Sequence, residues 1–128
     1  MKIKTFVINL EVSKDRREYV IAETAKYPCM DVELVNAVYG KKMSVEEIEG
    51  LFECKRFKSR YLREPMLTEI GCTLSHRECY RRLLISEEQY ALILEDDVRF
   101  WDSARMEFVL SEICLLYTSP SPRDPKTS

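Results

Sequence analysis

The sequence predicts an α/β fold, with a mostly parallel, doubly wound sheet flanked by helices. Short apolar, β-branched segments alternate along the chain with longer segments that carry helix-capping residues. Strands that alternate with helices in this way pair in parallel, because each helix returns the chain to the end at which the preceding strand began. A length of 128 residues suffices for one domain with a core and is short for two.

Three segments are predicted to form strands because they are rich in β-branched and other apolar residues. They are residues 4–10, 31–38 and 90–95. The second alternates polar and apolar residues, and Gly40 marks the turn that follows it. The third runs straight into charged residues, which makes its end a candidate for function.

Helices are predicted from capping residues and proline boundaries. They cover residues 14–26, 45–52, 68–87 and a final segment that begins after Asp102 or Ser103. Ser44 and Glu47 have the spacing of a capping box, in which each side chain accepts a hydrogen bond from the other residue's backbone N–H. The basic stretch 54–65, closed by a proline, is predicted to be irregular.

Charged residues make up 33% of the chain, but the signs nearly cancel and leave a net charge of -2. This balance predicts no nucleic-acid partner. The apolar run after the first lysines is too short for a signal peptide or a membrane span, so we expect a cytoplasmic protein. The five cysteines, odd in number and irregular in spacing, favour free thiols over a disulfide framework.

The last residues depart from every pattern before them. The segment 114–124, CLLYTSPSPRD, matches one translated reading frame of a common transposase-type sequencing adapter. We therefore expect the natural sequence, residues 1–113, to stop within the final helix, and residues 114–128 to form a non-native, disordered tail. A natural tail rich in proline and serine is the alternative.

Glu95, Asp96 and Asp97 follow the third predicted strand directly. In doubly wound sheets, ligands bind outside the carboxyl ends of the strands. Alternation along the strand predicts Glu95 and Asp97 on one side and Asp96 on the other. Such a group of oxygen ligands suits Mg²⁺ or Mn²⁺, with substrate phosphates and water completing the coordination. Solvated loop acids are the simpler alternative.

Three stretches of the chain together resemble glycosyltransferase family 25, the bacterial lipooligosaccharide and lipopolysaccharide glycosyltransferases related to the collagen galactosyltransferases. They are FVINLEVSKDRRE, LTEIGCTLSH and ALILEDDV, with NAVYG as a weaker fourth. They follow one another in the family's order over residues 6–98. One departure is Thr68, which precedes Glu69 where the family usually has a glycine.

The resemblance implies that residues 1–113 are the N-terminal part of a GT-A-like (Rossmann-like) nucleotide-sugar-binding domain. It further implies a UDP-sugar donor, usually UDP-galactose, inversion at the anomeric carbon, and a saccharide acceptor on lipooligosaccharide or another glycolipid. A divalent metal, Mn²⁺ or Mg²⁺, would bind the donor diphosphate. Asp97 would be its principal ligand with Glu95 as a second, and Glu95 or Asp96 would contact metal-bound water or the ribose. The catalytic base is expected beyond residue 113.

Two further residues are candidate contacts of the nucleotide. Asn9 ends the first predicted strand, where it could bind the nucleotide or form a turn. Arg16 lies in the first turn of a helix, where a cation opposes the helix dipole. Its partner is predicted to be the diphosphate or a nearby acid, and pairing with surface acids is the alternative.

Cys72, His76 and Cys79 share one face of the helix 68–87. Zinc is one interpretation, but no fourth ligand is evident, so a packed face is favoured. A group of cations over residues 55–63 could meet an anionic glycolipid or the inner membrane surface, or form a solvated loop.

A different class of protein also has acids after a strand. A receiver domain binds Mg²⁺ and accepts phosphate on aspartate, but its acidic pair follows the first strand, whereas the acids here follow the third. A binding domain without catalysis on the same fold is a further alternative.

Overall fold

The structure, a computed structural model, describes residues 2–118 and contains a three-stranded sheet with the strand order β2-β1-β3. The strands are β1 (Ile3–Asn9), β2 (Met30–Asn36) and β3 (Leu92–Glu95), and β1 pairs in parallel with both neighbours. The predicted parallel α/β fold is confirmed, with strand ends within one or two residues of the expected ones.

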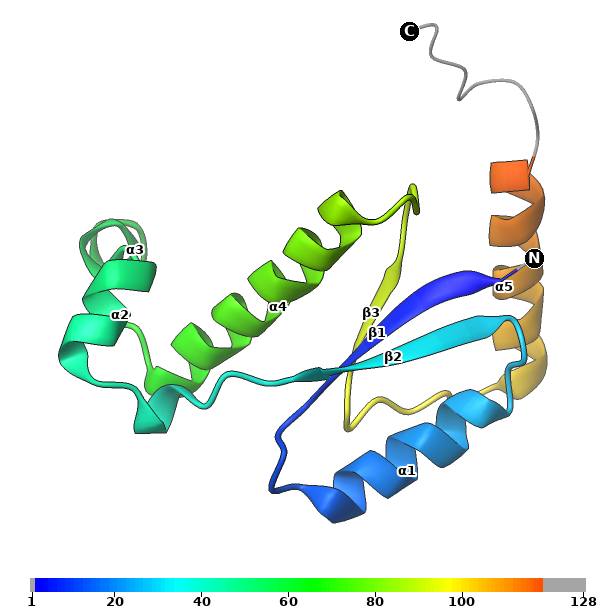
Figure 1. The fold of residues 1–128 in the computed structure, drawn as a ribbon, viewed down its shortest axis with the longest axis horizontal. Coiled ribbons are helices and arrows are strands. Elements are labelled where there is room, and N and C mark those ends of the chain that lie inside the picture. The colour runs from blue at the N-terminus through cyan, green and yellow to red at the C-terminus, as the bar shows by residue number, and fades with distance from the viewer. Residues whose placement is uncertain (1, 119–128) are drawn as a thin grey trace, which may run out of the picture.

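Helices connect and cover these strands (Figure 1). They are α1 (Lys14–Ala25), the 3₁₀ turn η1 (Gly40–Lys42), α2 (Val45–Leu51), α3 (Cys54–Tyr61), α4 (Leu67–Ile85) and α5 (Ser103–Thr118). The chain passes from β1 through α1 to β2, and returns through α4 to β3 on the far side of β1. The sheet is therefore wound in both directions from its central strand.

Alternating residues of β1 supply the two faces of the core. One face belongs to a cluster that α5 covers, formed by Ile3, Tyr27, Met30 and Leu110. The other belongs to a cluster that α4 covers, formed by Phe6, Ile8, Val35 and Cys79. Because successive side chains of a strand point to opposite faces, the same alternation decides which face each polar residue at the end of the strand joins.

Residues 54–61 of the stretch predicted to be irregular form helix α3, so the prediction is wrong there, whereas residues 62–65 are irregular. Cys54, Phe57 and Tyr61 recur at helical spacing, and the rings of Phe57 and Tyr61 lie 4.6 Å apart. The helix ends at Leu62, whose φ of 60° lies in the left-handed region. The helical spacing of these apolar residues indicates a helix, but the many cations between them obscure the pattern in the sequence.

The final helix begins where the sequence predicts. Asp102 Oδ1 accepts a hydrogen bond from the backbone N–H of Arg105 at 3.1 Å, which is the geometry of a helix cap. Helix α5 continues to Thr118, five residues beyond the boundary expected at Ile113. The remaining expected tail, residues 119–128, lies outside the described residues, and the boundary itself stays a prediction.

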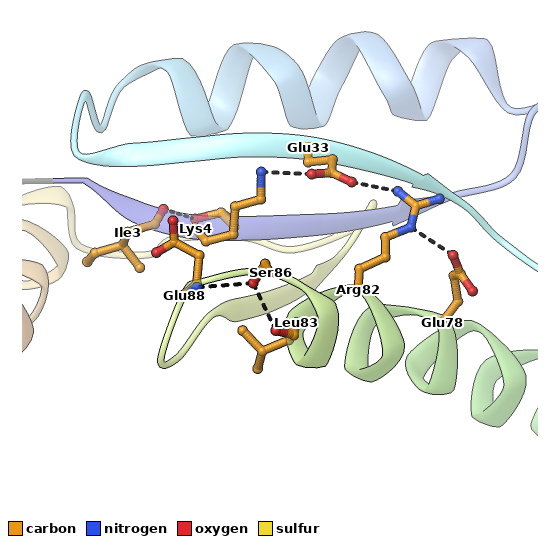
Figure 2. A network of polar contacts seen from close by, with 9 residues as sticks. Ile3, Lys4, Glu33, Glu78, Arg82, Leu83, Ser86 and Glu88 are labelled. Atoms are coloured by element: carbon orange, nitrogen blue, oxygen red, sulfur yellow. Dashed lines mark hydrogen bonds and ion pairs between the residues drawn. The ribbon is translucent and has the colours of Figure 1, made fainter. Parts of the chain in front are cut away.

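Charged side chains attach α4 to the sheet (Figure 2). Glu33 of β2 accepts from Lys4 of β1 and from Arg82 of α4, each at 2.7 Å. Arg82 also donates to Glu78 at 2.8 Å. The hydrogen bond from Lys4, with further help from Arg82, holds the pKa of Glu33 below its ordinary value. Three elements are thus joined by one partly buried network.

All five cysteines are free thiols in the structure. Among the described residues, no helix combines the length and apolar character that crossing a bilayer requires.

Candidate functional site

The carboxyl ends of β1 and β3 meet where the winding of the sheet reverses. In doubly wound sheets this switch point is the usual place for a ligand, because the helices on either side leave a crevice there. A cavity of about 290 Å³ lies at this point. Its walls come from the ends of β1 and β3, the start of α1, the loop from Ala37 to Lys41, and the first turns of α4.

The acids after β3 diverge. Glu95 is the last residue of the strand, and its carbonyl accepts from the backbone N–H of Val98 at 3.1 Å, which places Asp96 and Asp97 in a turn. Asp96 is buried, at 8% exposure, while Glu95 and Asp97 are exposed. Burial therefore separates Asp96 from its two neighbours, while the placement of Glu95 and Asp97 on one side stays a prediction, because Asp97 lies in a turn and not in a continuing strand.

Asp96 is held by residues from the first strand and helix. Asn9 donates from Nδ2 to Asp96 Oδ2 at 2.8 Å, and Arg16 Nη1 lies 3.4 Å from Asp96 Oδ1. Arg17 donates to Asn9 Oδ1 at 3.0 Å. The nearby acid expected to pair with Arg16 is thus Asp96, and this network closes the end of the sheet on the α1 side.

The loop after β2 packs against α4 with no space for side chains. A Cβ on Gly40 would lie 2.0 Å from the carbonyl oxygen of Leu67, and a Cβ on Gly71 would lie 2.5 Å from that of Val38. Ser75 Oγ accepts from Val38 N–H at 2.8 Å and donates to the Gly71 carbonyl at 2.7 Å. These contacts fix one wall of the cavity.

Sequence reasoning missed several cavity residues. Tyr39 and Lys41 line the cavity, and so does Thr68, which the sequence marked only as a departure from the family. The stretch NAVYG, which contains Tyr39, pointed to a turn rather than to a ligand wall. Together with Arg16, Lys41 supplies positive charge to the lining of this cavity. A cavity with cations, carboxylates and an apolar loop suits a phosphate-bearing nucleotide.

The predicted site residues occupy three different positions. Arg16, Glu95 and Asp96 line the cavity. Asn9 is buried directly behind it, where it positions Asp96. Asp97 lies on the outer turn and has no hydrogen bond or ion pair to another described residue. Asp97 therefore remains available to a hard divalent cation, whereas Asp96 is held by Asn9 and Arg16, and Glu95 contacts residues of α4 through Oε2.

The helical face that carries the cysteines divides between core and cavity. Cys79 is fully buried in the cluster under α4, as a packed face requires. Cys72 and His76 instead lie beside Glu95, with Cys72 Sγ at 3.8 Å and His76 Nε2 at 3.6 Å from Glu95 Oε2. Burial, then the charge of Glu95, raises the pKa of the Cys72 thiol.

The basic group of α3 and the following loop is exposed and partly paired. Arg56 lies 3.5 Å from Glu53, Lys58 lies 3.0 Å from Glu64, and Arg63 lies 2.7 Å from Glu69. Arg63 and the N–H of Met66 hold the pKa of Glu69 at about 2. A solvated face explains this arrangement without a ligand.

Fold and site together define an α/β domain with a parallel sheet flanked by helices and a polar cavity at its switch point. The sequence profile of glycosyltransferase family 25 (LPS biosynthesis protein) matches residues 2–117. The chain belongs to this family, which confirms the resemblance found in the sequence. Membership of this family also excludes the alternative of a receiver domain.

The chain is similar to curated animal members of this family. It is 34% identical over 98 residues to human procollagen galactosyltransferase 2, covering 74% of this chain and 16% of that protein. It is 35% identical over 102 residues to procollagen galactosyltransferase 1-A of Xenopus laevis, covering 76% and 16%. A glycosyltransferase 25 family member of Aedes aegypti is 32% identical over 98 residues, covering 74% and 16%. The chain thus spans about a sixth of these relatives' length. No solved structure matches significantly.

Proposed function

We propose that the chain is the donor-binding part of a hexosyltransferase that uses a UDP-sugar. The observation that carries this proposal is the cavity at the ends of β1 and β3, whose lining includes the cations Arg16 and Lys41 together with the carboxylates of Glu95 and Asp96. Cations attract the diphosphate of the donor, and the loop around Val38 offers an apolar surface to its nucleobase. Galactose is the favoured sugar, because the named relatives are galactosyltransferases.

A divalent metal, Mn²⁺ or Mg²⁺, fits the two exposed carboxylates of this end. Glu95 and Asp97 would hold it, and both oxygen ligands suit a hard cation that also takes phosphate oxygens. When bound, such a metal stabilises the negative charge of a departing diphosphate as a Lewis acid. Asp96 has a different task, because Asn9 and Arg16 hold it in place and it fixes the turn that presents Asp97.

The acceptor is proposed to be a saccharide of lipooligosaccharide or lipopolysaccharide, in line with the family's description as LPS biosynthesis proteins. The relatives' names specify procollagen instead, so the donor side of the reaction has the broader support. Inversion and a cytoplasmic location remain predictions. Peripheral contact of the α3 cations with the inner membrane surface also remains a prediction. The base that activates the acceptor is expected outside this chain.

Calorimetry of the 128-residue chain tests the donor site. UDP should bind in the presence of Mn²⁺ and about tenfold more weakly without it, a difference of about 1.4 kcal/mol. Asp97→Asn should remove the metal dependence, while Glu87→Gln, an exposed acid remote from the cavity lining, should not. Metal-independent UDP binding, or none by a folded chain, would overturn the proposal.

A further inference from the structure

We propose that Cys72, His76 and Glu95 form a site for a thiophilic divalent cation, with Zn²⁺ as the natural occupant. The inference goes beyond donor binding, because its cation is held by sulfur and nitrogen as well as oxygen. Glu95 is the one ligand that this site shares with the proposed donor-metal site. The three ligand atoms come from two elements, α4 and the end of β3, and all lie within 4.8 Å of one another.

The separations are close to those of a coordinated ion. Zinc bonds of about 2.3 Å to sulfur and about 2.0 Å to nitrogen or oxygen place tetrahedral ligands roughly 3.3–3.6 Å apart. Glu95 Oε2 lies 3.8 Å from Cys72 Sγ and 3.6 Å from His76 Nε2. These two separations exceed the coordinated values by only a few tenths of an ångström.

The helix supplies a pre-arranged pair of ligands. Cys72 and His76 are one turn apart on α4, so their side chains point to the same side. One helix face alone cannot surround a tetrahedral ion. The end of β3 supplies what the helix lacks, since Glu95 contributes a ligand from another direction.

The electrostatics of the triad favour a cation. Cys72 Sγ and the carboxylate of Glu95 lie 3.8 Å apart, so a thiolate at this position would repel the carboxylate unless a cation lay between them. A bound metal ion would stabilise the thiolate and the carboxylate together. Thiolate and imidazole ligands select zinc over magnesium, calcium or manganese, which prefer oxygen.

The site is open to solvent and leaves a coordination position free. Cys72 is exposed, and the side chains of His76 and Glu95 retain 29% and 56% exposure. Three protein ligands with a free fourth position is the arrangement of zinc sites that bind water or substrate. Because Cys72 and Glu95 also line the cavity, the fourth position adjoins the proposed donor site.

Cobalt titration of the untagged 128-residue chain under reducing conditions tests this site. Co²⁺ should produce tetrahedral d–d bands and a sulfur-to-metal charge-transfer band at one equivalent per chain, and Zn²⁺ should displace it. Cys72→Ser should abolish the charge-transfer band, and His76→Gln should weaken binding at least tenfold. Cys54→Ser, a half-buried cysteine on α3, serves as the matched control and should leave the spectrum unchanged.

The variants also separate this site from the proposed donor metal. Asp97→Asn should keep the cobalt spectrum, since Asp97 is not part of the triad. Absence of the charge-transfer band in the folded chain would overturn the proposal. So would its survival in Cys72→Ser, or its loss in Cys54→Ser or Asp97→Asn. Circular dichroism of each variant establishes that the chain is folded.

Discussion

The side-chain amide of Asn9 donates a hydrogen bond to the carboxylate of Asp96 across 2.8 Å, joining residues 87 positions apart. Asn9 ends β1 and Asp96 immediately follows β3, so this bond fastens together the two strand ends that flank the cavity. Both side chains are buried. The contact gives Asp96 a structural task that its exposed neighbours in the acidic triplet do not share.

Replacing adjacent acids should therefore have unequal effects on stability. Asp96→Ala leaves the buried amide of Asn9 without its acceptor and should lower the free energy of unfolding by about 2 kcal/mol. Asp97→Ala removes an exposed side chain without protein partners and should change it by less than about 0.5 kcal/mol. Urea unfolding followed by circular dichroism measures both values. Equal losses would show that the Asn9–Asp96 bond does not stabilise the fold.

Close packing of the loop on α4 predicts a difference between glycines. Gly71→Ala places a methyl group 2.5 Å from the carbonyl oxygen of Val38 and should cost about 2 kcal/mol of stability. Gly50→Ala is the matched control, because no atom lies within 4 Å of its Cβ position. As a helix residue it should gain about 0.5 kcal/mol. Thermal unfolding compares the two, and a neutral Gly71→Ala would contradict the packing described.

The Glu33 network predicts a pH-dependent contribution to stability. Because Lys4, and then Arg82, lower the pKa of Glu33 below its ordinary value of 4.5, the folded state is stabilised above that pH. The contribution is lost as the pH falls from 4.5 through the lowered pKa. Glu33→Gln should cost about 1 kcal/mol at neutral pH, a figure reduced for partial exposure.

The pH series needs a control in the same part of the chain. Glu87→Gln, an exposed acid after α4, should change the free energy of unfolding little at any pH. The difference between wild type and Glu33→Gln, measured by urea unfolding, should shrink toward pH 3. A difference that stays constant over this range would mean that the carboxylate charge is not what stabilises the network.

Two neighbouring lysines allow binding in the cavity to be distinguished from binding on the surface beside it. Lys41 lines the cavity, whereas Lys42 lies over the ring of Tyr39, 5.6 Å from its centre, and is not part of the lining. Lys41→Ala should weaken UDP binding about tenfold, while Lys42→Ala should change it less than twofold. Titration at two salt concentrations checks the cause, because the loss in Lys41→Ala should become smaller as salt screens the charge.

Much of the fold followed from the sequence because its signals were local. The β-branched segments predicted all three strands, and Asp102 predicted the start of α5. Position after a buried strand placed Glu95 and Asp96 at the cavity. The sequence offered a nearby acid as one partner of Arg16 but could not identify it as Asp96, because the two residues meet only through the tertiary fold.

Other features had weak or misleading signals. In α3 the cations outnumber the apolar residues, so the spacing of Cys54, Phe57 and Tyr61 was overlooked. The approach of Cys72 and His76 to Glu95 depends on the packing of α4 against β3, which no single segment encodes. Lys41 was missed because a residue after a turn glycine has no periodicity that marks it as lining a cavity.

The central claim is that the cavity between β1 and β3 binds the donor nucleotide, and amide NMR tests it most directly. UDP with Mg²⁺ should shift the backbone amide signals of Val38–Lys41 and of Gly71, which line the cavity wall. The signals of Tyr27 and Cys29, on the hollow beside α5, should stay in place. Shifts confined to Tyr27 and Cys29, or no shifts in the folded chain, would contradict the account.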